Sequence, residues 1–203
     1  MTKKILIPSI AILVLLVGYW YVAPSKPFDF SGGTEGRIAG PINQALAARF
    51  DYLSQNGNSS CSQSFRDSIA SMADAMHLQG SCCSPMSTHR YREQVEGLKK
   101  FKSEPSQNIA KIPDDPYNIK AELAKELMSY YDMELTADEQ NAYDYAMQHS
   151  SEKGPCCCKC WRWYVYGGLG KYLIRNHQFT GQQVTNVWDL SDGCGGDSEH
   201  HHG

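Results

Sequence analysis

The chain has 203 residues, with 19 lysines and arginines against 22 aspartates and glutamates, and a formal net charge of −3 at pH 7. Because it lacks a basic excess or a stripe of Lys and Arg that could follow a phosphate backbone, we expect no nucleic-acid partner. The length suffices for one domain with a substantial apolar core.

The N-terminal residues 1–23 have the pattern of a transmembrane signal-anchor. Two lysines precede the apolar run 5–22, which ends in Tyr-Trp-Tyr. About 18–20 apolar residues span a bilayer, and Tyr and Trp favour its interfaces. The lysines favour a cytoplasmic N-terminus, so we expect a membrane-anchored protein whose domain lies on the extracytoplasmic side, periplasmic or at the cell surface. A cleaved signal peptide is the competing interpretation.

The rest of the chain divides by composition. Residues 24–40 are rich in Pro, Ser, Lys and Gly and indicate a flexible linker, and residues 197–203 form a polar tail. Between them, apolar side chains in 41–196 recur at the three- and four-residue spacing of helices, without persuasive strand alternation. We predict an all-α fold, a single cysteine-rich helical-bundle domain of about six or seven helices.

Helix signals follow one another in chain order. Helices are expected from Pro41 to Gly57, Cys61 to Gly80, Tyr91 to Phe101, Asn118 to Leu127, Thr136 to Gly154, about 158 to 176, and from Thr180. Three prolines make 102–117 a connecting loop, and Thr136 and Thr180 each open a capping box. The glycines within 167–170 weaken a helix unless another helix or a ligand approaches its backbone closely.

Four of the eight cysteines fall within 156–160, and Cys82-Cys83 form a second pair. A core needs no such thiol density, so the run indicates chemistry. If the following helix begins at Cys157 or Cys158, its dipole together with Lys159 and Arg162 favours the thiolate, which is the metal-binding form.

A site for a thiophilic metal is the leading hypothesis. The run and the second pair should each begin a helix after a turn that contains Gly or Pro, and we expect them to meet at one end of the bundle. The predicted ligands are Cys82, Cys83, Cys156, Cys157, Cys158, Cys160 and His89. Cu(I) is favoured because it accepts two or three sulfur ligands, followed by Zn(II) and then an iron–sulfur cluster. The function predicted is metal delivery, storage or sensing, more consistent with a binding protein than with an enzyme.

Two alternatives stay open. Cys157 and Cys160 form a C-x-x-C pair, which is typical of thiol–disulfide oxidoreductases. Alternatively, the eight cysteines form disulfides, and the protein is an accessory subunit whose Trp/Tyr-rich helix contacts a partner membrane protein or metal-trafficking protein.

The hexapeptide Pro155-Cys156-Cys157-Cys158-Lys159-Cys160 resembles the Pro-Cys-Tyr-Cys-Gly-Cys signature of the PCYCGC-motif family of bacterial extracytoplasmic proteins. The proline and the cysteines at 156, 158 and 160 match, whereas Cys157 and Lys159 replace Tyr and Gly. The Gly-His pair that follows the family's motif is absent. The resemblance implies a small, exported, cysteine-rich protein and identifies no activity.

Overall fold

The computed structural model describes residues 43–195, which belong to one compact unit. Within this range seven α-helices are present: α2 Gln44–Asn56, α3 Gln63–Ser68, α4 Thr88–Phe101, α5 Ala121–Ser129, α6 Ala137–His149, α7 Trp161–His177 and α8 Gly181–Asp189. Short 3₁₀ turns occupy Ile69–Ser71 and Pro105–Gln107. The predicted helical fold is confirmed for this range. The predicted anchor, linker and polar tail lie outside the described residues, and no helix between 43 and 195 is long and apolar enough to cross a membrane.

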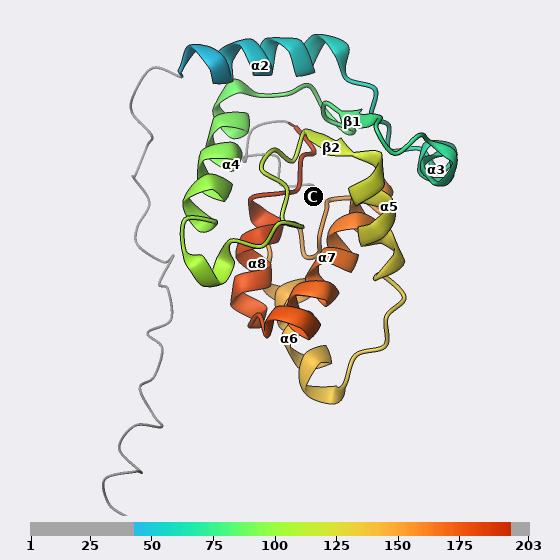
Figure 1. Cartoon of the computed structure of the whole chain (residues 1–203), viewed down its shortest axis with the longest axis vertical. Coiled ribbons are helices and arrows are strands. Elements are labelled where there is room, and N and C mark those ends of the chain that lie inside the picture. The colour runs from blue at the N-terminus through green and yellow to red at the C-terminus, as the bar shows by residue number, and fades with distance from the viewer. Residues whose placement is uncertain (1–42, 196–203) are drawn as a thin grey trace, which may run out of the picture. The chain divides into compact units, whose positions relative to one another are not determined.

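Helix α7 is the centre of the core. It packs against α5, α6 and α8, which Figure 1 shows gathered around it. Trp161, Val165, Leu169 and Leu173 are fully buried at four-residue spacing along one side. On another side, a Cβ atom at Gly168 would overlap the backbone of Leu127 in α5. Of the two explanations that the sequence allows for these glycines, a neighbouring helix or a ligand, the structure shows a neighbouring helix at Gly168.

A two-stranded antiparallel sheet corrects the prediction of an all-helical domain. Strand β1 (His77–Gln79) pairs with β2 (Asn118–Lys120), with Leu78 opposite Ile119, and both of these side chains are buried. The predicted helix 61–80 is accordingly wrong beyond its first two turns, and the helix predicted from Asn118 begins at Ala121.

Hydrogen bonds from two serine side chains to the backbone explain why α3 is short. The hydroxyls of Ser68 and Ser71 donate to the carbonyls of Phe65 and Ser68, three residues before each. Such local bonds compete with the helical ladder. The chain then becomes extended at Met72 and reaches the strand position where Leu78 enters the core.

Helix α6 begins where the sequence predicts, because Thr136 and Glu139 form both bonds of a capping box. Thr180 and Gln183 do the same for α8. These two ends fix the helices that hold α7, whose N-terminus carries the cysteine run. Helix α2 packs separately against α4, through Leu46, Leu53 and Tyr91.

Candidate metal centre

All eight cysteines gather in one cluster, drawn from four separate segments of the chain. Cys61 precedes α3, the pair Cys82-Cys83 follows β1, residues 156–160 precede α7, and Cys194 follows α8. Segments up to 133 residues apart in sequence therefore meet at one place (194 − 61 = 133). We name this set of eight side chains the thiol cluster.

The sulfurs form a continuous network of contacts. The Sγ of Cys82 lies 3.6 Å from that of Cys83 and 3.7 Å from that of Cys160. Cys160 lies 3.8 Å from Cys156, which is 2.9 Å from Cys194. The expected meeting of the Cys82-Cys83 pair with the run is thus present in the geometry.

Cys83 closes the network into a ring and extends it. Its sulfur lies 3.6 Å from that of Cys157, which is 3.2 Å from Cys194. It also lies 3.5 Å from Cys158 and 2.9 Å from Cys61. Cys83 therefore contacts both the first and the third segment, and Cys82 makes a further contact with the third segment through Cys160.

Three predicted details need correction. His89 is exposed near the start of α4, and no metal-holding group among residues 43–195 includes it. Helix α7 begins at Trp161 with Cys160 as its N-cap, not at Cys157 or Cys158, so only the last cysteine of the run lies at the helix terminus. Cys82 and Cys83 lie in a bend five or more residues before α4, so they do not open that helix (88 − 83 = 5).

Cys61 and Cys194 are not among the ligands that the sequence predicts. Cys61 lies just before the N-cap Ser62 of α3, and its thiol donates to the carbonyl of Cys82 at 2.9 Å. Cys194 was visible only as an isolated cysteine between glycines. The number of cysteines was the signal that could have pointed to both, because the predicted ligands include only six of the eight.

Two glycines set the position of Cys194. Gly193 and Gly195 have φ of 56° and 77°, values that residues with a Cβ rarely adopt. Between them, the carbonyl of Cys194 accepts hydrogen bonds from the backbone N–H and the hydroxyl of Ser84, both at 3.1 Å. This joins the C-terminal loop to the Cys82-Cys83 loop and directs the Cys194 side chain into the cluster.

Burial is graded across the cluster. Cys156, Cys160 and Cys194 are buried, whereas Cys83 is exposed. The other four cysteines are partly exposed. The cluster is therefore closed to solvent at Cys156, Cys160 and Cys194 and open at Cys83, which we call its open rim. Ions and partner molecules can reach it from the Cys83 side.

Hydrogen bonds among the thiols divide them into proton donors and acceptors. A hydrogen bond from Cys156 lowers the pKa of Cys158 to about 6 and is also the largest influence lowering the pKa of Cys82 and Cys157. The pKa values of Cys83 and Cys156 are raised, chiefly through their hydrogen bonds to Cys157. The pKa values of Cys61, Cys160 and Cys194 are raised as well, so the thiolate, which is the metal-binding form, is favoured only at Cys82, Cys157 and Cys158.

Five of the sulfur contacts, at 3.5 to 3.8 Å, are close to the spacing of ligands that share a metal, whereas three are shorter, at 2.9 to 3.2 Å. Two sulfurs bound to one ion at about 2.3 Å are about 3.8 Å apart in a tetrahedron and about 4.0 Å apart in a trigonal plane. The contacts of Cys82 with Cys83 and Cys160, and of Cys156 with Cys160, lie at 3.6 to 3.8 Å. All eight side chains are free thiols. The cluster can therefore hold a metal ion.

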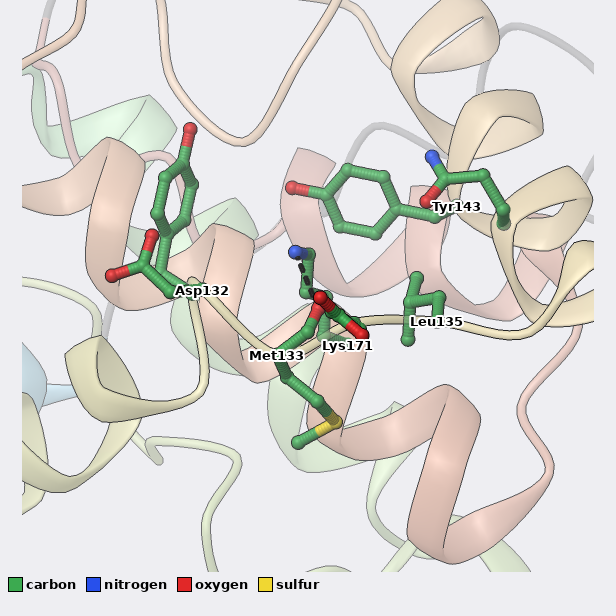
Figure 2. A pocket seen from close by; sticks show the side chains of 8 residues that line it. Asp132, Met133, Leu135, Tyr143 and Lys171 are labelled. Carbon is green, nitrogen blue, oxygen red and sulfur yellow. Dashed lines mark hydrogen bonds between the residues drawn. The ribbon is translucent and has the colours of Figure 1, made fainter.

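An open pocket elsewhere, of about 580 Å³, has no cysteine in its lining (Figure 2). Figure 2 shows Lys171 reaching the Met133 carbonyl, to which its ammonium donates at 2.8 Å. Burial lowers the pKa of Lys171, and the rings of Tyr131 and Tyr143 each lie 5.7 Å from its nitrogen. With its cation occupied by these contacts, the pocket offers no set of groups comparable with the thiol cluster.

Comparisons with protein-family models, curated proteins and solved structures found no match for this chain. The resemblance of residues 155–160 to the PCYCGC motif stays a prediction. The function of this chain must therefore be inferred from the geometry of the thiol cluster.

Proposed function

We propose that this protein binds a soft metal ion through the thiol cluster and serves in metal storage, delivery or sensing on the extracytoplasmic side of a membrane. The observation that supports metal binding is the convergence of eight free thiols from four segments, in sets of three whose sulfurs lie within 4.8 Å of one another. Thiolate sulfur is a soft ligand that selects Cu(I), Zn(II) and iron–sulfur clusters over hard cations. The membrane location is an expectation from residues 1–23.

Cu(I) is the metal that we favour. Among residues 43–195, the sets of ligand atoms lying within 4.8 Å of one another contain three sulfurs each. Cu(I) is stable with three sulfur ligands, whereas structural Zn(II) takes four in a tetrahedron. Zn(II) is the second candidate, since the eight cysteines exceed the four sulfurs that a tetrahedral site takes. An iron–sulfur cluster is third, because its cysteines bind different irons and lie further apart than sulfurs on one ion.

Elemental analysis tests this proposal. The full chain is purified under reducing, oxygen-free conditions after growth with added copper, and copper, zinc, iron and free thiols are counted per chain. We expect about one or more copper ions per chain. Cys83→Ser should lower the copper content, because Cys83 contacts four other cysteines.

His89→Ala is the matched control. His89 lies six residues after Cys83 (89 − 83 = 6), yet it belongs to no metal-holding group of the described chain. We expect its copper content to equal that of the unaltered protein. A chain that carries no metal under these conditions, with its cysteines oxidised to disulfides, contradicts the proposal.

Thiol–disulfide exchange is the second candidate, because Cys157 combines partial exposure with a lowered pKa caused mainly by its hydrogen bond with Cys156. An exchange enzyme would reduce insulin disulfides, and Cys157→Ser and Cys160→Ser would each abolish that activity. The accessory-subunit alternative is less well supported, since Trp161 and Tyr166 of α7 are fully buried in the core of this chain and cannot contact a partner.

A further inference from the structure

We infer that the thiol cluster builds a single polynuclear Cu(I)–thiolate centre with shared sulfurs, and that the buried guanidinium of Arg162 is its fixed counter-ion. The inference rests on the proposed metal binding and goes beyond it, because it specifies the number of ions, the sharing of ligands and the charge of the centre. Two independent observations support it: the overlap of the three-sulfur sets, and the surroundings of Arg162.

The three-sulfur sets overlap too strongly to be separate sites. There are five within the described residues: Cys61–Cys83–Cys158, Cys61–Cys82–Cys160, Cys82–Cys83–Cys194, Cys156–Cys157–Cys194 and Cys156–Cys158–Cys160. Every cysteine except Cys157 belongs to two of them. An ion in each set would therefore share its sulfurs with neighbouring ions, which is the arrangement of a bridged cluster.

A site for one ion would not require this arrangement. A single three-coordinate ion uses three thiolates and leaves five cysteines crowded beside it without a role (8 − 3 = 5). Crowded thiolates repel one another unless positive charge lies between them. Several ions placed among the eight sulfurs remove that repulsion and use every cysteine.

Arg162 is a buried cation in the element that carries the run. Its side chain is fully buried, two residues after Cys160, and stacks on Trp161 with the guanidinium carbon 4.4 Å from the ring centre. One terminal nitrogen donates to the carbonyl of Gly80 at 2.8 Å and the other to that of Pro116. Its Nε has no hydrogen-bond partner. A buried charge of this kind needs a compensating negative charge.

The nearby carboxylates are paired with other arginines. Asp192 accepts from Arg90 at 3.3 Å, and Asp115 accepts from Arg49 at 2.7 Å. No ion pair between a carboxylate and Arg162 is present in residues 43–195. The carboxylates of this part of the chain thus leave Arg162 without a direct counter-charge.

Thiolates are the anions that remain. The Arg162 side chain starts two residues after Cys160, the N-cap of α7. The guanidinium also lies against Gly193, next to Cys194, and bonds to Gly80, two residues before Cys82. Arg162 is therefore held beneath the cluster by the same loops that carry the cysteines.

The charge of the loaded cluster follows from its composition. Each thiol that binds releases its proton to solvent and gives a sulfur lone pair to Cu(I), and copper stays in the +1 state throughout. With one ion in each of the five sets and eight thiolates, three negative charges remain (8 − 5 = 3). Arg162 neutralises one of them from the buried side, and the open rim leaves the others to water and to Lys159, which lies in the run itself.

Native mass spectrometry of the full, reduced chain titrated with Cu(I) as its acetonitrile complex tests the inference. The mass gives the number of copper ions bound, and the isotope pattern gives the number of protons lost. We expect loading to pass directly from the free chain to a form with about five ions, because shared ligands make binding cooperative. More protons than copper ions should be lost.

Two serine variants of the run form a matched pair. Cys157→Ser removes one of the five three-sulfur sets and Cys156→Ser removes two. We expect the maximum load to fall by one ion in the first variant and by two in the second. Equal losses in the two variants, or saturation of the unaltered chain at a single ion, would overturn the polynuclear centre. In the second case the proposed metal binding would survive, whereas a chain that binds no copper would remove both.

Substitutions of Arg162 test the counter-ion. Arg162→Met should lower the excess of lost protons over bound copper by about one, because the cluster then keeps a thiol protonated, and Arg162→Lys should restore it. Far-UV circular dichroism checks that each variant folds. The counter-ion role is wrong if the proton excess is the same in the Met variant, the Lys variant and the unaltered chain. It is also wrong if either variant fails to fold and the unaltered chain loses equal numbers of protons and copper ions. In both cases Arg162 has only a structural role.

Discussion

Gly168→Ala is the substitution that most directly tests the packing of α7, the helix that carries the cysteine run. Gly168 lies where α7 crosses α5. A methyl group there would overlap the carbonyl oxygen of Leu127, come within 2.9 Å of its carbonyl carbon and within 3.1 Å of the Tyr131 backbone nitrogen. These are backbone atoms of α5 and of the turn that follows it, and they cannot rotate away as a side chain can, so α5 and α7 must move apart.

The magnitude follows from two opposing effects. Replacing glycine by alanine within a helix gains about 1 kcal/mol in helix propensity. Overpacking against backbone costs about 1–3 kcal/mol, and the upper end applies because no side chain can absorb the displacement. We expect the free energy of unfolding to fall by about 2 kcal/mol.

Gly97→Ala provides the control. Its new methyl group would meet the end of the Leu190 side chain at 2.5 Å, and this side chain can change rotamer. Urea unfolding of the full-length variants, followed by far-UV circular dichroism, measures both changes. We expect Gly97→Ala to stay within about 1 kcal/mol of the unaltered protein. If Gly168→Ala proves as stable as Gly97→Ala, the close crossing of α5 and α7 is wrong.

Three further predictions concern stability. Tyr166→Phe should leave the free energy of unfolding unchanged or raise it, because the buried Tyr166 hydroxyl has no hydrogen-bond partner. Tyr91→Phe should lower it by about 1 kcal/mol, since the Tyr91 hydroxyl donates to Asp115. The opposite order in urea unfolding contradicts both assignments. Hydrogen bonding to Arg175 lowers the pKa of Glu139 from 4.5 to about 2, so this carboxylate contributes stability that is complete above pH 4.5 and is lost as the pH falls towards 2. Glu139→Gln should flatten that part of the curve of melting temperature against pH, and an unchanged curve refutes the link. Removing bound metal with a Cu(I) chelator should lower the unfolding free energy by RT ln(1 + [L]/Kd), about 2.7 kcal/mol for a metal present at 100 times its Kd, and a melting temperature indifferent to the chelator shows that the ion does not bind the folded state preferentially.

The sequence by itself determined the helices whose signals are local. The capping boxes at Thr136 and Thr180 begin α6 and α8 where they are predicted, because such a box involves residues only three apart. The glycines within 167–170 indicated that another helix or a ligand approaches this segment closely, and the backbone of Leu127 in α5 lies against Gly168. The thiol density of 156–160 pointed to a soft-metal site without any knowledge of the fold.

The tertiary structure alone decided which side chains complete the site. Cys61 and Cys194 join the cluster, and His89 does not, because the loops after β1 and α8 turn towards the start of α7. The pairing of Leu78 with Ile119 likewise joins segments that are 41 residues apart (119 − 78 = 41). Hydrophobic periodicity describes what one segment can bury, but not which distant segment it meets. Contacts of this kind are set by packing of the whole core, so they are absent from any local pattern.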